Sequence, residues 1–177
     1  NSKIFSDRSY AYQLDKTPLD AVIKLRSSLR DETIFISQYD FSSYFDSLNH
    51  SYIDNLIDSN SFLITPIESK LLKATLRHQY TVASGATDRR IRGTPQGNSL
   101  SLFLANLAAH PLDEDLDLLN GTFTRFADDS VVINTGYEDA LRTAAVFHRF
   151  SARSGSSINL VKSTGIRLFS ESAREIS

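Results

Sequence analysis

The chain has 177 residues, and its 19 basic and 21 acidic side chains leave a formal net charge of −2. Hydrophobic residues make up 41% and charged residues 23%, which is typical of one globular domain or a large part of one. No stretch approaches the ~18 apolar residues of a membrane span. Without cysteine, neither a disulfide framework nor a thiolate metal site can form. We expect a cytoplasmic protein without a membrane partner, and the lack of any methionine suggests a piece of a longer polypeptide.

Residues 1–16 are predicted to be an irregular lead-in, and five helices follow it. Thr17 before Pro18, and Thr65 before Pro66, are typical helix starts. The predicted helices run from about Thr17 to Leu29, Asn49 to Ile57, Thr65 to Arg77, Leu100 to Leu119 and Glu138 to Arg153. Pro111 predicts a kink or a restart in the fourth helix.

Seven short strands are predicted between these helices. They are Thr33–Asp40, Gln79–Ala83, Asp88–Arg92, Phe123–Phe126, Val131–Ile133, Ser157–Leu160 and Gly165–Phe169. The first is apolar on both faces and therefore buried, and Ser84-Gly85 is typical of a hairpin turn. This order predicts an α+β fold: an antiparallel sheet with helices packed on one side.

Two adjacent carboxylates, Asp128 and Asp129, lie at the turn between two of the predicted strands. An Asp-Asp pair at a surface turn often does no more than favour the turn. Asp40 adds a third carboxylate, at the end of a buried strand, where a charge is costly unless it is paired or binds a metal. Neighbouring strands lie only ~4.8 Å apart, so the three aspartates could share one site.

Three carboxylates suit hard cations such as Mg²⁺, which leave part of their coordination shell to substrate phosphates. Two such ions ~3.5–4 Å apart would favour phosphoryl transfer. The loop Gly93–Gly97 fits a substrate-binding element, because its glycines permit close approach of a main chain and Gln96 offers one donor and one acceptor. Taken alone, this loop is also an ordinary connection between a hairpin and a helix.

Four segments, in this order and spacing, resemble the catalytic motifs of reverse transcriptases. They are Tyr39–His50, Arg92–Leu107, Phe126–Asp129 and Ile158–Ser163, and Ser9–Tyr12 through Asp20–Val22 is similar to a fingers element of the bacterial members. The resemblance implies a polymerase palm. Residues 1–32 would be the lead-in with part of the fingers and residues 33–177 the palm, with a fingers insertion at about 60–92 and with the thumb and N-terminal fingers absent.

The resemblance implies roles for residues at the matching positions. Asp40, Asp128 and Asp129 would be catalytic and, with the main-chain carbonyl of Phe41, would ligate two Mg²⁺ ions, with Mn²⁺ as an alternative. Phe45 falls at the ring that clashes with a ribose 2′-hydroxyl, which predicts deoxynucleotides as substrates. Outside this motif, Phe45 would be an ordinary core aromatic.

The nucleotide site would also include main-chain amides, the glycine loop and one lysine. Its members would be Ser42, Ser43, Tyr44, Gln96, Gly97 and Lys162, although Lys162 can equally be read as a solvated lysine. Nearby basic residues could bind nucleic-acid phosphates or form a solvated strand face: Arg89, Arg90 and Arg92. The four histidines, His50, His78, His110 and His148, have no ligand spacing and receive no role.

Several positions depart from the usual pattern of the family. Phe126 replaces a tyrosine, and Gln13 stands where bacterial relatives carry arginine. Asn98–Leu102 differs from the Gly-x-x-Ser-Pro of group II intron enzymes. Together with Pro111–Asp113 and Gly165–Phe169, it looks more like the defence-associated, abortive-infection reverse transcriptases of bacteria.

The predicted function is RNA-directed DNA synthesis, a nucleotidyltransferase reaction in bacterial anti-phage defence. Its partners would be an RNA template, a primer or nascent DNA, deoxynucleoside triphosphates and other parts of the parent polypeptide. One alternative is template-independent or protein-primed synthesis, and another is a non-catalytic scaffold that binds RNA or a partner. A two-metal nuclease would explain the carboxylates but neither Phe45 nor the Gln96 loop. The template, the priming mode and the oligomeric state stay open.

Overall fold

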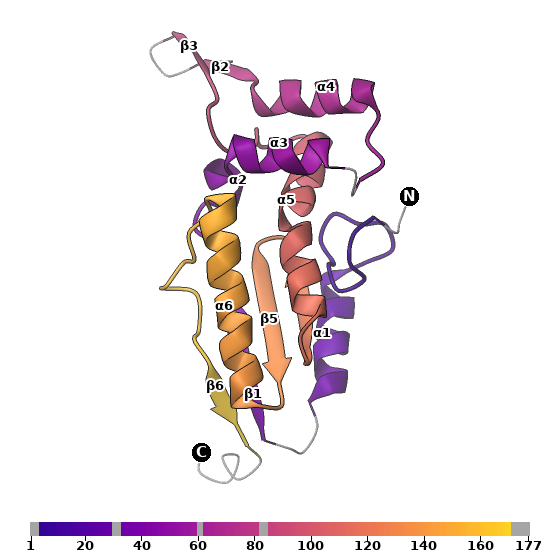
Figure 1. Cartoon of the computed structure of the whole chain (residues 1–177), viewed down its shortest axis with the longest axis vertical. Coiled ribbons are helices and arrows are strands. Elements are labelled where there is room, and N and C mark those ends of the chain that lie inside the picture. Colours follow the sequence, from indigo (N-terminus) through magenta and orange to yellow (C-terminus); the bar gives the residue numbers. More distant parts are fainter. Residues whose placement is uncertain (1–3, 30–32, 60–61, 82–84, 171–177) are drawn as a thin grey trace.

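A four-stranded antiparallel sheet, in the order β4-β5-β1-β6, forms the body of the protein (Figure 1). The computed structural model describes residues 4–29, 33–59, 62–81 and 85–170. The sheet consists of β1 (Ile34–Tyr39), β4 (Gly121–Phe126), β5 (Asp129–Asn134) and β6 (Arg167–Phe169). A separate hairpin pairs β2 (Gln79–Thr81) with β3 (Thr87–Arg89). The predicted α+β fold with an antiparallel sheet is confirmed.

Six helices accompany the sheet in the described part of the chain, and three of them begin with side-chain caps at predicted helix starts. They are α1 (Pro18–Ser28), α2 (Tyr44–Ser47), α3 (His50–Asp58), α4 (Pro66–Leu76), α5 (Ser99–Asp117) and α6 (Tyr137–Ser154). Thr17 and Thr65 each form a capping box, and the Asn49 side chain caps α3. Helix α6 is capped at its C-terminus by Gly155, whose φ of 80° is the left-handed conformation that glycine adopts without strain.

The core lies between the sheet and the two long helices, which stand in front of the strands in Figure 1. The ring of Tyr39, from β1, stacks on Phe147 of α6 with 3.8 Å between ring centroids. Phe41 meets Phe150 edge to face at 5.1 Å. Alternate residues of β1 point to the other face, where Gln38 is exposed. One face of the sheet is therefore closed by α6, and the other is partly open.

A second layer of short elements lies beyond one end of the sheet. Helices α3 and α4 lie across the upper end of α5 in Figure 1, and the β2–β3 hairpin projects beyond them. The hairpin confirms the strand pairing predicted around Gly85, although β3 is shorter than expected. Residues 82 and 83 of the predicted first strand, and Ser84 of the predicted turn, lie outside the described residues.

Of the two outcomes predicted at Pro111, the restart is wrong. Helix α5 continues through the proline, because the one hydrogen bond that proline removes costs less than the burial of neighbours such as Leu107 and Leu112 gains. The predicted strand Ser157–Leu160 is also wrong, since only Ile158 forms an isolated bridge, with Phe41. The described residues 4–16 of the lead-in are irregular, as predicted, but part of this segment pairs with the sheet, where Ser9 forms a parallel bridge with Arg125.

In the part of the chain that the structure describes, no helix is both long and apolar enough to cross a membrane.

Candidate functional site

The three predicted catalytic aspartates converge at one end of the sheet. Asp40 directly follows β1, and Asp128 lies in the turn before β5, which begins at Asp129. Strands β1 and β5 pair with Tyr39 opposite Ser130, so the next step of this register sets Asp40 beside Asp129. Asp40 is only 4% exposed, whereas Asp128 is half-buried and Asp129 exposed.

The pKa values of Asp128 and Asp129 are both raised, by burial and by the charge of neighbouring carboxylates. Burial, and then the charge of Asp40, raises the pKa of Asp128 above its ordinary value, although Lys162 opposes the shift. Burial, followed by the charges of Asp128 and Asp40, also raises the pKa of Asp129. Among the residues that the structure describes, the one ion pair of these three carboxylates is between Oδ1 of Asp40 and the Nζ of Lys162, at 3.7 Å. The site therefore holds more negative charge than its neighbours compensate.

The donor set suits a divalent cation. Oδ2 of Asp40 is buried without a hydrogen-bond partner among the described residues, and Asp129 can donate to Asp40 only when it is protonated. As the side chains stand, no group of three or more His, Asp or Glu residues in the described ranges has the geometry of a metal site. The unpaired oxygen and the crowded charges nevertheless fit a cation better than any other partner in the site.

A buried arginine that was not among the predicted site residues supports the Asp128–Asp129 turn. The Arg125 side chain is 1% exposed, and it makes two parallel hydrogen bonds, of 2.7 and 2.6 Å, to the fully buried carboxylate of Asp113 in α5. Its Nη1 also donates to the carbonyl of Ala127 at 2.8 Å. Ala127 has a φ of 58°, so this bond holds a left-handed turn residue immediately before Asp128.

The same guanidinium ties the N-terminal segment to the site. Nη2 of Arg125 donates to Oγ of Ser9 at 2.9 Å, and its Nη1 donates to Oδ1 of Asn106 at 3.2 Å. Asn106 in turn donates to the carbonyl of Ala11 at 2.8 Å. Residues 8–10 thus extend the sheet beside β4 and bring Tyr12 to the site. The position of Arg125, directly before Phe126–Asp129, was the only sequence signal for this network.

The predicted glycine loop lies against α2 and supports Phe45. The amide of Thr94 donates to the carbonyl of Phe45 at 2.6 Å, and the amide of Gly93 donates to Leu48 at 2.7 Å. A Cβ at Gly93 would come within 2.6 Å of the Asp46 main chain, and the φ of Gly93 is +74°. Only glycine therefore permits this contact.

Two side chains extend the contact between the loop and its surroundings. Nε2 of Gln96 donates to Asp46 at 3.0 Å, while Gly97 is exposed with a φ of 94°. Nε2 of His50, which is buried, lies 2.7 Å from the carbonyl of Gly93. His50 received no role from the sequence, because its spacing from other histidines carries no information about a main-chain partner.

Phe45 is half-buried between two tyrosine rings. It meets Tyr44 at 5.9 Å and Tyr12 at 6.4 Å between ring centroids, both edge to face. Tyr44 is 2% exposed, and its hydroxyl donates a hydrogen bond of 2.9 Å to the carbonyl of Ala105. Only the main chain of Tyr44 is therefore available to bind a ligand. Tyr12 is 47% exposed, and burial, followed by the charge of Asp128, raises its pKa.

The remaining predicted residues surround this centre. The amide of Ser42 already donates to Ser157 at 2.8 Å, and Ser43 has a φ of 47° at the start of α2. Phe41, whose main-chain carbonyl is a predicted metal ligand, forms an isolated antiparallel β-bridge with Ile158. Lys162 is exposed apart from its contact with Asp40.

The three predicted phosphate-binding arginines lie on and just after the β2–β3 hairpin. A cavity of about 290 Å³ there is lined by Asp46, Tyr80, Asp88, Arg89, Arg90, Ile91 and Arg92. Arg90 lies over the ring of Tyr80 at 5.5 Å and 3.5 Å from Asp46. Arg89 and Arg92 are exposed. Asp46 therefore links this cavity to Gln96 and the glycine loop.

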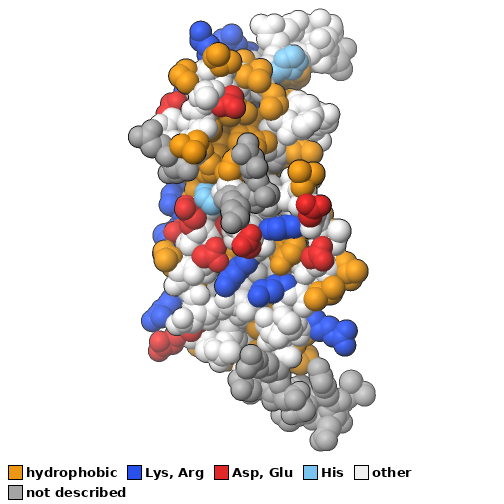
Figure 2. Space-filling view, turned by 90° about the vertical axis from the view of Figure 1, so that its right-hand side faces the viewer, with side chains coloured by type: hydrophobic (Ala, Val, Ile, Leu, Met, Phe, Trp, Pro, Cys, Tyr) orange, Lys and Arg blue, Asp and Glu red, His pale blue; other side chains and the backbone are white. Residues whose placement is uncertain are grey.

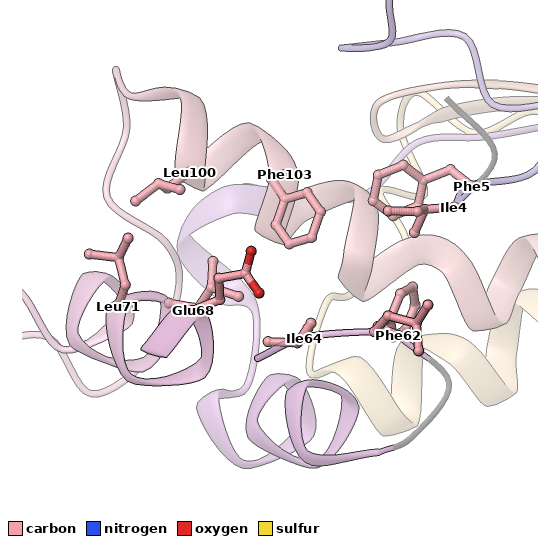
Figure 3. A pocket seen from close by; sticks show the side chains of 10 residues that line it. Ile4, Phe5, Phe62, Ile64, Glu68, Leu71, Leu100 and Phe103 are labelled. Atoms are coloured by element: carbon pink, nitrogen blue, oxygen red, sulfur yellow. The ribbon is translucent and has the colours of Figure 1, made fainter. Parts of the chain in front are cut away.

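A larger, mainly apolar pocket of about 410 Å³ lies away from the carboxylates. Its walls come from the N-terminal segment, α4 and its preceding loop, and α5, with Phe5, Phe62 and Phe103 among the lining side chains (Figure 3). Figure 2 shows hydrophobic side chains gathered in the upper half of one face, with acidic and basic side chains intermingled below them. None of the predicted site residues lines the pocket.

Comparisons with known proteins agree with this geometry. A family model described as "Reverse transcriptase (RNA-dependent DNA polymerase)" matches residues 2–174. The structure is similar to that of apo telomerase from Candida tropicalis truncated from the C-terminal domain, with a TM-score of 0.70 and 14% identity over 92% of this chain and 36% of that one. A comparison with curated proteins found no match.

Two telomerase structures in complex with a TWJ fragment of telomeric RNA are also similar. The Candida tropicalis protein has a TM-score of 0.67 and 15% identity, over 91% of this chain and 30% of that one. The Candida albicans protein has a TM-score of 0.67 and 12% identity, over 93% and 31%. At these identities the likeness shows the fold alone, and the chain spans about a third of the length of these proteins.

Proposed function

Because this chain belongs to the reverse transcriptase family, we propose that it is the palm, with part of the fingers, of an RNA-directed DNA polymerase. Residues 33–177 would form the palm, with a fingers insertion at about 60–92, and residues 1–32 would belong to the fingers. The reaction is nucleotidyl transfer, in which a 3′-hydroxyl attacks the α-phosphate of a deoxynucleoside triphosphate and pyrophosphate leaves. The observation that carries the proposal is the convergence of Asp40, Asp128 and Asp129 at one end of the sheet.

The carboxylates of Asp40, Asp128 and Asp129, with the carbonyl of Phe41, would hold two divalent cations, Mg²⁺ or Mn²⁺. When bound, such ions activate the attacking hydroxyl and neutralise charge on the phosphate. The raised pKa values of Asp128 and Asp129 support this assignment, because crowded carboxylates gain most from a cation. Arg125 would fix the Asp128–Asp129 turn without touching the substrate.

The incoming nucleotide would lie between the carboxylates and the glycine loop. Phe45 would exclude a ribose 2′-hydroxyl, and Gln96 and Gly97 would contact the nucleotide or the template. The amides of Ser43 and Tyr44 would receive the triphosphate, with Ser42 beside them. Lys162, 3.7 Å from Asp40, would neutralise or protonate the departing pyrophosphate.

Nucleic acid would bind beside the glycine loop, where Arg89, Arg90 and Arg92 border the cavity of about 290 Å³. Exposed Arg89 and Arg92 would contact phosphates. The partners would be an RNA template and a primer or nascent DNA, and other parts of the intact polypeptide would complete the binding channel. The weak excess of acid over base in this chain supports the need for those parts.

A role in bacterial anti-phage defence is the finer proposal, and it rests on Asn98–Leu102 and the neighbouring motifs. Some defence relatives make DNA without a conventional template or primer, so template-independent or protein-primed synthesis is the alternative within this class. A non-catalytic scaffold has less support, because it would keep Oδ2 of Asp40 buried and unpaired without any gain.

Primer extension with Mg²⁺ by the intact protein tests the proposal, with an RNA template, with a DNA template and without a template. We expect extension on RNA that Asp128→Asn lowers by at least about a thousandfold, as loss of a group that acts in the transition state does. Glu138→Gln, an exposed change in α6, serves as the matched control and retains wild-type extension. Template-free products would favour the alternative, and equal extension by Asp128→Asn would contradict both.

A further inference from the structure

Phe45 does not stand alone beside the catalytic carboxylates, because Tyr12 packs against its ring from the N-terminal segment. The two ring centroids lie 6.4 Å apart with an interplanar angle of 71°. Tyr44, on the other side, meets Phe45 at 5.9 Å and 82°. Tyr44 is held by its hydroxyl bond to Ala105. The orientation of Phe45 therefore depends on one buried ring and one exposed ring.

The position of Tyr12 is fixed by buried contacts rather than by its own side chain. Ala11 is fully buried, and its carbonyl accepts a hydrogen bond from Asn106. Asn106 and Ser9 both bind the guanidinium of Arg125, which also binds the carbonyl of Ala127 before Asp128. Tyr12 itself has a φ of 59°. One buried arginine thus fixes the distance between Tyr12 and the catalytic turn.

Tyr12 also borders the open part of the site. Its side chain is nearly half exposed, although its ring touches Phe45. Burial, followed by the smaller effect of the Asp128 charge, raises the pKa of the Tyr12 hydroxyl, so Tyr12 lies near the Asp128 turn as well as against Phe45. This is the region that the sugar of a nucleotide would occupy if its base lay at the glycine loop and its phosphates lay at the aspartates.

We propose that Tyr12 determines sugar specificity, because its ring holds Phe45 against the site and forms a second wall of the sugar pocket. The inference rests on the proposed polymerase function and deepens it. Without the Tyr12 ring, Phe45 can turn away and a ribose 2′-hydroxyl fits. The Tyr12 hydroxyl is not needed for this packing, so phenylalanine serves as well as tyrosine at this position.

The test is the ratio of kcat/KM for a deoxynucleotide to that for the matching ribonucleotide, measured by primer extension with the intact protein. We expect Tyr12→Ala to lower this ratio by about tenfold, mainly through faster use of the ribonucleotide. Tyr12→Phe keeps the ratio within about twofold of the wild type. Leu14→Ala, an 85% exposed change in the same segment, is the control and leaves the ratio unchanged.

Two results would overturn the inference. One is an unchanged ratio in Tyr12→Ala, and if both nucleotides are then used equally more slowly, the role of Tyr12 is merely structural. The other is a loss of selectivity in Tyr12→Phe as large as in Tyr12→Ala. Absence of extension by the wild type would instead overturn the proposed function itself, and this failure is distinguishable because both of the other results require an active wild-type enzyme.

Discussion

Arg125 holds together three parts of the protein that are distant in sequence. Its guanidinium binds Asp113 in α5, Ser9 in the N-terminal segment and Ala127, which directly precedes the proposed catalytic residue Asp128. Both members of the ion pair are almost fully buried. A buried pair adds little net stability over an apolar pair, but loss of one partner leaves an uncompensated charge. Arg125 is therefore a positioning residue for the candidate site.

We expect Arg125→Ala to lower the free energy of unfolding by about 3–5 kcal/mol, because Asp113 stays buried without its partner. Urea denaturation at neutral pH measures this loss. Arg153→Ala is the matched control, since Arg153 forms an exposed ion pair with Asp115 at 2.9 Å and its loss costs at most about 1 kcal/mol. Equal effects of the two substitutions would show that the buried pair has no special role.

The burial of Asp128, together with the nearby charge of Asp40, makes the stability of the protein depend on pH. Because the pKa of Asp128 is raised in the folded state, that state binds more protons than the unfolded state between the ordinary and the raised pKa. The free energy of unfolding therefore falls as the pH rises through this window and stays lower above it. The repulsion is absent at acid pH, where the carboxyl is protonated in both states.

In metal-free buffer, Asp128→Asn should therefore be more stable than the wild type at neutral pH, and this difference should vanish below the ordinary pKa of aspartate. Thermal unfolding followed across the pH range measures it. Asp58→Asn is the control, because Asp58 pairs with Lys73 at 2.6 Å and its loss gives no such gain. A neutral-pH stability at or below that of the wild type would contradict the repulsion.

At the scale of elements, the loop before α5 is built around the one turn of α2. Gly93 approaches the Asp46 main chain so closely that a Cβ would lie 2.6 Å from it. The amide of Thr94 donates to the carbonyl of Phe45, and Nε2 of His50 lies within hydrogen-bond distance of the carbonyl of Gly93. The loop and the Phe45 ring are therefore positioned as one unit, so a change in the loop moves Phe45.

Gly93→Ala should cost about 2–4 kcal/mol of stability, which combines the left-handed conformation and the overlap with Asp46. Gly85→Ala should cost only about 1–2 kcal/mol, because Gly85 has a similar φ of +81° but open space around it. Denaturation curves of the two variants give the comparison. If both lose the same stability, the close approach at Gly93 is not a constraint.

Local sequence signals predicted the regular elements and missed those that tertiary contacts decide. The capping boxes at Thr17 and Thr65 marked the starts of α1 and α4, because caps depend on neighbouring residues only. Helix α2 was missed, since a single turn has no periodicity. The restart that was one of two outcomes predicted at Pro111 does not occur, because burial of the surrounding helix is not visible locally.

At the scale of the whole molecule, the motifs predicted which aspartates meet but not what supports them. Asp40 and Asp128 are far apart in sequence, and strand pairing brings them to one end of the sheet. The edge pairing of Ser9 with Arg125 was not predicted, because a bridge between distant residues leaves no pattern in either segment. The network around Arg125 was missed for the same reason.

The charge distribution predicts weak binding of nucleic acid by this chain alone. The net charge is −2, and acidic and basic side chains are intermingled on the face that Figure 2 shows. We expect the logarithm of the RNA affinity to fall with the logarithm of salt concentration with a slope of about −1 to −3, as for a few phosphate contacts. Fluorescence anisotropy at several salt concentrations measures it, and a slope near −6 or steeper would contradict the prediction.

The most direct test is whether Asp40, Asp128 and Asp129 form one cation site. Binding of Mn²⁺ to the protein, followed by the electron paramagnetic resonance of the free ion, measures this without any assumption about the template. We expect the wild type and Glu138→Gln to bind Mn²⁺ alike, and Asp40→Asn to bind at least about tenfold more weakly. Equal binding by Asp40→Asn would contradict a shared site and, with it, the proposed catalysis.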